Sequence, residues 1–264
     1  MFQFPNINPI AIDFGLVKVS WYALSYIIGI LSSWYFILKI IKIKKIQINN
    51  KIVSDLISNC MIGVIIGGRL GYVIFYNPEY YFDNLIEIFK IWNGGMSFHG
   101  GFIGVILAII YSSKTSNIPI IMFSDLISIV SPIGLFFGRI ANFINGELFG
   151  RVTNHYFGII FPNGGKLPRH PSQLYEAFFE GLVLFFIMIF LMNKSKFFEK
   201  TGFLTASFIF FYGTFRFFIE YLREPDRHLG LIYFDFSMGQ ILSLPMIFSG
   251  LYFMIVFYNK NVEN

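Results

Sequence analysis

Long apolar stretches separated by short polar loops dominate the chain. Seven stretches contain at most two charged residues each: 19–38, 56–76, 96–113, 118–137, 172–192, 201–222 and 236–259. A helix needs about 20 apolar residues to cross a bilayer, and lipid offers no other partner for backbone polar groups. The pattern therefore predicts an all-α, polytopic membrane protein with seven transmembrane helices in a single domain, residues 1–264.

The charged residues between these stretches indicate the orientation. The first loop carries five lysines, at positions 39, 42, 44, 45 and 51, and short basic loops stay in the cytoplasm. Seven crossings then place the N-terminus outside and the C-terminus inside, with small elements on the outer side. The first 16 residues contain no lysine or arginine, which argues against a cleaved signal peptide.

The composition supports a membrane protein and narrows its partners. Hydrophobic residues make up 55% of the chain and charged residues only 13%, whereas soluble domains carry about a quarter charged residues. The formal net charge is +5, but lysines in short loops set topology or meet lipid head groups. We therefore expect no nucleic acid partner. The four histidines (99, 155, 170 and 228) are scattered, so we expect no metal and no cofactor.

Arginine is distributed differently from lysine. In the predicted topology every basic residue of the cytoplasmic segments is a lysine. Arginine occurs in or near the outer half, at positions 69, 139, 151, 169, 216, 223 and 227. The planar guanidinium binds phosphate or carboxylate with two parallel hydrogen bonds, whereas lysine acts as a point charge. The pattern indicates recognition of an anion on the outer side. Ordinary ion pairing with nearby acids is the alternative.

A histidine lies among glycines at the outer end of the third stretch, in GGMSFHGGFIG (94–104). His99 is a candidate functional group, because ionisable residues within membrane segments are by default functional and a neutral imidazole accepts a proton near pH 7. The alternative is an interfacial histidine that only binds backbone. The glycines allow close approach of a ligand or of a neighbouring helix, and packing alone would explain Gly100 and Gly104.

A second polar segment, GRIANFINGELFGR (138–151), directly follows the fourth stretch. Arg139 and Asn142 share a face if helical, and Asn145–Gly146–Glu147 reads as a turn that leads to Gly150. Such a density of polar groups next to an apolar span indicates a site for an anionic head group. A plain outer loop is the alternative.

The sixth stretch carries Tyr212, Arg216 and Glu220, spaced four and four along one helix face. A purely structural pair of Arg216 and Glu220 is the alternative, but burying charges costs desolvation, and an apolar pair is often as stable. This favours a functional role.

Arg69 lies seven residues before Tyr76, about 10 Å deep at 1.5 Å per residue, and needs a partner there. A structural bridge to an acid is the alternative to a functional role. Tyr22 is a weaker candidate, because aromatic residues gather at membrane interfaces anyway. Asp125 and Cys60 are interpreted as structural. Residues 78–92, with Glu79, Asp83 and Glu87 four apart between aromatic residues, predict a short helix lying in the interface.

Several segments, taken in order, resemble the bacterial phosphatidylglycerol–prolipoprotein diacylglyceryl transferase family. They are SWYALSY, GGRLGY, GGMSFHGGFIG, GRIANFINGELFGR, LPRHPSQLYEA, YGTFRFFIEYLREPD and SMGQILSLPM. The resemblance covers nearly the whole chain, and its motifs are specific. Members have seven spans with the N-terminus outside, in agreement with the pattern above.

This resemblance implies a reaction, its partners and a location. Diacylglyceryl passes from phosphatidylglycerol to the lipobox cysteine thiol of a prolipoprotein signal peptide, which forms a thioether and releases glycerol phosphate. The reaction is the first step of lipoprotein maturation. It would take place in the bacterial inner (cytoplasmic) membrane, among membrane lipids, with the active site toward the periplasmic face and without a cofactor.

The resemblance also assigns residues by position. It implies that Arg139 binds the phospholipid head group, within a signature that includes Asn142, Asn145, Glu147 and Gly150. It implies a reaction cavity lined by His99, Tyr22, Arg69, Tyr212, Arg216 and Glu220. The outer stretch 151–169 is short for the family, which leaves auxiliary contacts to the preprotein open.

The reaction itself suggests roles for these groups. Arg139 and Arg216 would stabilise the charge that develops on the phosphate as the C–O bond breaks. His99 is the simplest base for a thiol of reference pKa about 8.5, although arginines can also lower a thiol pKa unaided. Glu220 is expected to orient Arg216.

Two other classes of function are alternatives to this transferase. A transporter or channel for a small anion would line its path with the same arginines, but the inner halves of the third and seventh stretches carry no ionisable group. An intramembrane protease would need paired aspartates or a serine–histidine signature, and the sequence shows neither.

Overall fold

The computed structural model describes residues 2–5, 7–15, 18–225, 230, 232 and 235–259 of the 264-residue chain. Arg227 and His228, named above, lie outside the described residues. The chain divides into two compact units: unit 1 comprises Met1–Ser33 and Asp125–Asn264, and unit 2 comprises Trp34–Ser124. The prediction of a single domain stays a prediction.

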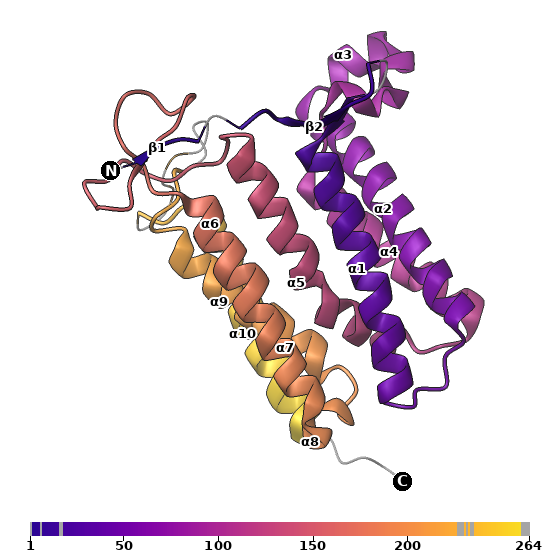
Figure 1. Cartoon of the computed structure of the whole chain (residues 1–264). Helices are drawn as coiled ribbons and strands as arrows, with labels where there is room; N and C mark the ends of the chain where they lie inside the picture. The colour runs from indigo at the N-terminus through magenta and orange to yellow at the C-terminus, as the bar shows by residue number, and fades with distance from the viewer. Residues whose placement is uncertain are drawn as a thin grey trace. The chain divides into compact units, whose positions relative to one another are not determined.

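Each of the seven predicted stretches is helical (Figure 1). The helices are α1 (Trp21–Ile43), α2 (Asn50–Tyr76), α4 (Phe98–Ser116), α5 (Ile120–Ile144), α6 (Ser172–Glu176) with its continuation through the π-helical η3 (Ala177–Val183) into α7 (Leu184–Asn193), α9 (Phe203–Ile219) and α10 (Met238–Asn259). The short α8 (Ser195–Phe198) follows α7. The predicted helical class is thereby confirmed.

Five helical segments of the described chain are long and apolar enough to cross a membrane: α1, α2, α5, α10 and the continuous segment Ser172–Asn193. The apolar α9 has only 17 residues. Helix α4 is not among the five, because glycines and His99 occupy its first turns and a polar run, 112–116, ends it. The helices thus support a multi-pass membrane protein, while the count of seven spans and the orientation of the termini stay predictions.

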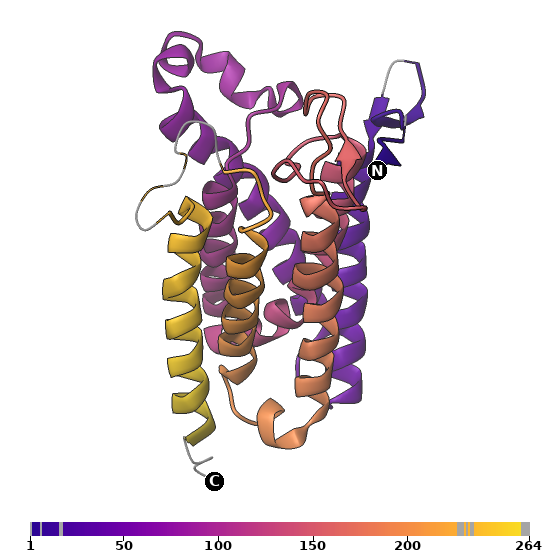
Figure 2. The same cartoon turned by 90° about the vertical axis from the view of Figure 1, so that its left-hand side faces the viewer.

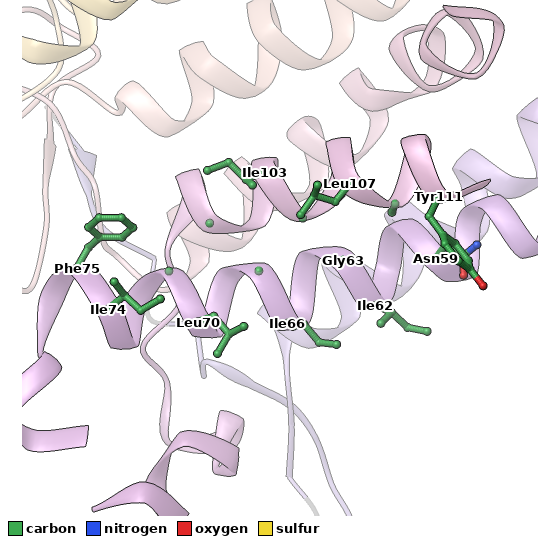
Figure 3. Close-up of a pocket in the computed structure, with 15 residues that line it drawn as sticks. Asn59, Ile62, Gly63, Ile66, Leu70, Ile74, Phe75, Ile103, Leu107 and Tyr111 are labelled. Atoms are coloured by element: carbon green, nitrogen blue, oxygen red, sulfur yellow. The ribbon is translucent and has the colours of Figure 1, made fainter. Parts of the chain in front are cut away.

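In unit 2, α2 and α4 lie side by side and their backbones approach closely (Figures 1 and 3). A Cβ atom at Gly104 would overlap the carbonyl oxygen of Gly63, and one at Gly100 would overlap that of Gly67. Only glycine permits this separation, as in other small-residue helix pairs in membranes. Helix packing therefore accounts for Gly100 and Gly104, the alternative that the sequence left open.

An apolar groove of about 530 Å³ follows the α2–α4 pair. Figure 3 draws the residues that line it, among them Ile62, Ile66 and Leu70 from α2 and Ile103 and Leu107 from α4. The close-packed glycines form part of its lining. Lipid chains are as apolar as these side chains, so this groove is compatible with a membrane environment.

The predicted interface helix at 78–92 is wrong as a single helix. The structure breaks it into α3 (Pro78–Asp83) and the 3-10 turns η1 (Leu85–Phe89) and η2 (Ile91–Asn93). We call residues 78–93 the arm. The breaks fall at Asn84 and Lys90, whose ψ angles of 64° and 69° are not helical. Figures 1 and 2 show the arm folded at the end of α2, where α4 begins.

In unit 1, α9 and α10 pack against each other along their lengths (Figure 2). Gly250 permits this, because a Cβ there would come 2.6 Å from the backbone nitrogen of Phe210. Asp125 of α5 accepts the backbone N–H groups of Gly202 at 2.7 Å and Thr205 at 2.8 Å. This caps the first turn of α9 and gives Asp125 the structural role expected of it.

Small β elements occur outside the helices. Strand β1 (Phe2–Gln3) pairs in parallel with β4 (Ile159–Ile160), and β2 (Ile10–Asp13) pairs antiparallel with β3 (Lys18–Ser20). An isolated antiparallel bridge joins Gly150 to Arg223. This bridge ties the segment after α5 to the segment after α9, the two places where polar residues concentrate.

Candidate active site

Two arginines from different helices meet at one carboxylate in unit 1. Arg139 Nε on α5 and Arg216 Nη1 on α9 each lie 2.9 Å from the same oxygen, Oε2 of Glu176 on α6. The Glu176 side chain is fully buried, while the two arginine side chains remain 18% and 13% exposed. The structure thus brings Arg139 and Arg216 together at one carboxylate, so ion pairing with nearby acids, the alternative given for the arginines, applies to both of them.

Further charges extend this arrangement, which we call the arginine cluster (Arg139, Arg216, Arg223, Glu176, Glu180 and Glu220). The buried Glu180 lies 3.6 Å from Arg139 Nη2 and 3.5 Å from Arg216 Nη1. Arg216 Nη2 is paired with Glu220, four residues on, as its helical spacing predicted. Arg223 Nη1 lies 3.6 Å from the same Glu220 oxygen.

Glu220 is held by the start of α10. Ser237 donates its hydroxyl to Glu220 Oε2 at 2.8 Å. Gly239 is packed against the carboxylate, since a Cβ at that position would lie 2.5 Å from Glu220 Oε1. A carboxylate at a helix N-terminus is also favoured by the helix dipole. Glu220 is therefore fixed in place, which suits the expected role of orienting Arg216.

The formal charges in the arginine cluster cancel. Three guanidinium groups face three carboxylates, so the formal charge of the cluster is zero. Burial, and then the charge of Arg216, lower the pKa of Arg223 below its ordinary value. Burial is the largest of these causes, because it disfavours the charged form of the guanidinium, while Glu176 and Glu220 act in the opposite direction.

The contacts also leave hydrogen-bonding capacity in the cluster. Among the described residues no hydrogen bond or ion pair engages Nη1 of Arg139. One oxygen of Glu176 and both oxygens of Glu180 are buried without a hydrogen bond. Buried carboxylate oxygens without hydrogen bonds are unusual in native structures and mark sites of strain or function.

Two predicted tyrosines lie near the arginine cluster. Tyr212 precedes Arg216 by one helical turn on α9 and is within electrostatic range of Arg139 and Glu180. Tyr22 stacks obliquely on Tyr26, with ring centroids 5.3 Å apart. Tyr26 is itself within range of Arg139.

The signature after Arg139 forms a compact turn. Asn142 Nδ2 donates to Glu147 Oε1 at 2.8 Å, and Asn145 Nδ2 lies 3.5 Å from the same oxygen. Gly146 adopts a positive φ of 65°, which confirms the predicted turn. Gly150 cannot carry a side chain, because a Cβ would overlap the carbonyl of Leu222. The turn thus follows the end of α5 and leads to Gly150, which lies next to the segment that carries Arg223.

Arg69 and His99 belong to unit 2. The guanidinium of Arg69 is buried, and its partners are backbone carbonyls of the arm and the following turn rather than the acid considered from sequence. His99 is the second residue of α4 and is exposed, with its ring at 5.7 Å from that of Phe98. That these two residues share one chamber with the arginine cluster stays a prediction.

Sequence reasoning gave no role to Glu176 and Glu180. Both were visible as two acids four residues apart at the start of an otherwise apolar stretch. The signal was their depth: an acid placed after the first turn of a membrane helix needs a cationic partner. A second signal was that arginines outnumber the nearby acids on the other helices, which indicates that acidic partners such as Glu176 and Glu180 come from elsewhere.

Comparison with known proteins gives a consistent result. The family model described as "Prolipoprotein diacylglyceryl transferase" matches residues 9–256. The chain is 54% identical to the phosphatidylglycerol–prolipoprotein diacylglyceryl transferase of Rickettsia felis over 249 residues, which cover 94% of this chain and 96% of that protein. It is 53% identical to the protein of that name from Rickettsia akari, with the same coverage. The protein of that name from Rickettsia bellii is 52% identical, over 96% of both chains.

Proposed function

The chain belongs to the prolipoprotein diacylglyceryl transferase family, and from this premise we propose how its residues carry out the reaction. It is a transferase that moves the diacylglyceryl group of phosphatidylglycerol to prolipoproteins. The acceptor in our proposal is the lipobox cysteine thiol. The reaction takes place in the bacterial inner membrane, with seven spans and the active site toward the periplasmic face.

The convergence of Arg139 and Arg216 on Glu176 is the observation that carries the proposal. The phosphodiester of phosphatidylglycerol brings one negative charge. It binds beside the two guanidinium groups, where Arg139 Nη1 is not engaged by a described residue. Arginine forks match phosphate oxygens in geometry as well as in charge.

Bond changes at the diacylglyceryl carbon define what the cluster must do. The thiolate sulfur attacks the glycerol carbon that carries the phosphate ester, an S–C bond forms, and the C–O bond breaks. The electron pair of that bond leaves on the phosphate, which becomes the monoester of released glycerol phosphate. A second negative charge thus develops beside Arg139 and Arg216, and preorganised donors aimed at such a charge are usually the largest catalytic contribution.

Glu176, Glu180 and Glu220 hold these donors in place. Arg139 and Arg216 contact the same carboxylate oxygen of Glu176, so without the carboxylates their positive charges would repel each other. Glu176 anchors both of them, and Glu220 fixes the second end of Arg216. Asn142, Asn145, Glu147 and Gly150 hold the turn beyond Arg139 and define the head-group end of the site, with Tyr22 and Tyr212 beside it.

The thiol proton needs an acceptor. His99 takes it in our proposal, because His99 is exposed at the outer end of α4 and a neutral imidazole is a base near pH 7. A thiol of reference pKa about 8.5 is only a few per cent thiolate at neutral pH, so a base raises the reactive fraction.

Incubation of the purified protein with phosphatidylglycerol and a lipobox peptide tests this proposal. We expect the mass of one diacylglyceryl group to be added to the peptide and glycerol phosphate to be released in equal amount. A peptide whose cysteine is replaced by serine is the matched control and should remain unmodified. Modification of the serine peptide, or release of glycerol phosphate without modification of the cysteine peptide, would contradict the proposed acceptor.

A further inference from the structure

The arm, residues 78–93, exposes more apolar surface than a segment in water would. Phe82, Ile86, Phe89 and Trp92 are between 75% and 77% exposed, and Leu85 is 60% exposed. Single exposed apolar residues are common, but a contiguous apolar patch marks an interaction with a partner or a membrane.

Arg69 holds the backbone of this arm. A guanidinium has five N–H donors, and all five of Arg69 are used by main-chain carbonyls. Nε donates to Ile88 at 2.8 Å, Nη2 donates to Glu87 and Lys90, and Nη1 donates to Gly94 and Gly95. The guanidinium also lies over the Tyr81 ring, 5.1 Å from its centroid.

Three of these carbonyls belong to the arm, those of Glu87, Ile88 and Lys90, and the carbonyls of Gly94 and Gly95 directly follow it; the Glu87 carbonyl also accepts the N–H group of Lys90 at 3.2 Å. The 3-10 turns η1 and η2 end at Phe89 and Asn93, so carbonyls around both points cannot enter continuous helical hydrogen bonds. Water would normally satisfy such groups, whereas in lipid each unsatisfied backbone group costs several kcal/mol. Arg69 supplies a side-chain donor to each of these carbonyls in place of water.

The position of Arg69 also limits where the arm can lie. Arg69 is seven residues before the end of α2, a distance of about 10 Å along the helix axis. Its side chain is 4% exposed, so the bound carbonyls reach down to a buried guanidinium beside a membrane helix. The arm is therefore folded back on the end of α2, where Ile74 and Phe75 are also exposed.

We propose that the arm is inserted into the lipid interface of the bilayer, and that Arg69 makes this possible by satisfying the carbonyls of its irregular backbone. The partner is the phospholipid leaflet itself. Three acids and one lysine (Glu79, Asp83, Glu87 and Lys90) give the arm a formal charge of −2, so anionic head groups do not attract it. Its insertion rests on apolar contact and is the same in a zwitterionic membrane.

Fluorescence of Trp92 tests the proposal in the full chain. Replacing Trp21 and Trp34, the two other tryptophans, by phenylalanine leaves Trp92 as the single reporter. The protein is reconstituted in phosphatidylcholine vesicles that carry bromine either near the head group or near the chain end. We expect strong quenching by the shallow bromine, weaker quenching by the deep bromine, and little quenching by aqueous iodide.

Two outcomes would overturn the insertion of the arm. Strong iodide quenching without bromolipid quenching would place Trp92 in water. Protection from both iodide and bromine would mean that protein, and not lipid, covers the arm. The measurement requires no phosphatidylglycerol and no peptide, so its failure is distinguishable from failure of the proposed transferase mechanism.

Arg69→Lys tests the second half of the proposal, because it keeps the charge and loses the five-donor fork. We expect several-fold greater iodide quenching of Trp92 in this variant. Glu79→Gln changes an exposed charge on the same arm and is the matched control, for which quenching should equal that of the parent. Equal quenching in Arg69→Lys and the parent would remove Arg69 as the positioning residue. If Arg69→Lys does not fold, the parent measurement with its two contrary outcomes still decides the insertion.

Discussion

The arginine cluster of unit 1 and the Arg69 site of unit 2 use the same side chain in opposite ways. Arg69 has every donor occupied by a backbone carbonyl. Arg139 and Arg216 are instead paired with carboxylates and keep part of their surface exposed. The carbonyls bound by Arg69 are part of the backbone, so they cannot leave the guanidinium unless their segment unfolds. A carboxylate can instead share its arginine with an incoming phosphate.

In our proposal this difference, more than depth in the membrane, distinguishes the structural Arg69 from the catalytic Arg139 and Arg216. Both sites lie within predicted membrane helices, and the sequence alone made their arginines candidates for a function in the same way. Two things distinguish them. One is the number of N–H donors without a partner among the described residues, and the other is the charge of the partners, which are neutral carbonyls at Arg69 and negative carboxylates at Arg139 and Arg216. The following predictions test this comparison, from the largest expected effect on turnover to the smallest.

Arg139→Lys should reduce turnover about 100- to 1,000-fold, the usual loss when one preorganised donor to a developing oxyanion is removed. Charge is retained in this variant, so the loss reports the missing fork. Transfer to a lipobox peptide measures it. Arg151→Lys is the control, because the Arg151 guanidinium donates to the backbone carbonyl of Arg223 instead of a carboxylate. Turnover of Arg139→Lys close to that of the parent would remove Arg139 from the mechanism.

His99→Gln asks whether unit 2 contributes to the chemistry at all. If His99 is the base, turnover at pH 7 should fall about 100-fold, the lower end of the usual contribution of a base. It should then recover as the pH rises from 6 toward 9, because hydroxide deprotonates the thiol without help. A low activity that does not change with pH would assign His99 to packing or positioning.

Glu176→Gln keeps the shape of the side chain and removes the charge shared by both arginines. We expect a lower KM for phosphatidylglycerol, since one competing anion is gone. We also expect kcat to be lower by about tenfold, the effect of losing roughly 1.4 kcal/mol of orientation in the transition state. Steady-state kinetics separates the two constants. An unchanged KM together with an unchanged kcat would show that Glu176 does not control the arginines.

Gly239→Ala perturbs the cluster from the far side of Glu220. The added methyl group would lie 2.5 Å from Glu220 Oε1 and push the carboxylate away from Arg216. Turnover should fall several-fold, with inserted protein still present at normal level. Gly134→Ala is the matched control, because a Cβ there meets nothing within 4 Å. Equal activities of the two variants would mean that Glu220 does not need its observed position.

Arg69→Lys should affect turnover least and stability most. Lysine cannot reach five carbonyls, and each buried carbonyl left without a partner costs about 1–3 kcal/mol. We expect a clear fall in the thermal unfolding midpoint in detergent, with residual turnover well above that of Arg139→Lys. The reverse order of the two activities would mean that Arg69 contributes to the reaction directly and would break the comparison.

Much of the molecule follows from local sequence. The seven helical stretches are set by runs of apolar residues, because lipid forces a backbone in that environment into helical hydrogen bonds. The pairing of Arg216 with Glu220 was also predictable, since residues four apart lie on the same helix face. The turn around Gly146 followed from its residue types in the same way.

Tertiary structure alone decided which groups meet across helices. Arg139, Glu176 and Arg216 come from three different helices, and their spacing along the chain carries no information about a shared oxygen. Arg69 looked like a partner for an acid, and its partners proved to be carbonyls 18 to 26 residues further on. Periodicity fixes the face of a helix on which a side chain lies, but only packing fixes what that face meets.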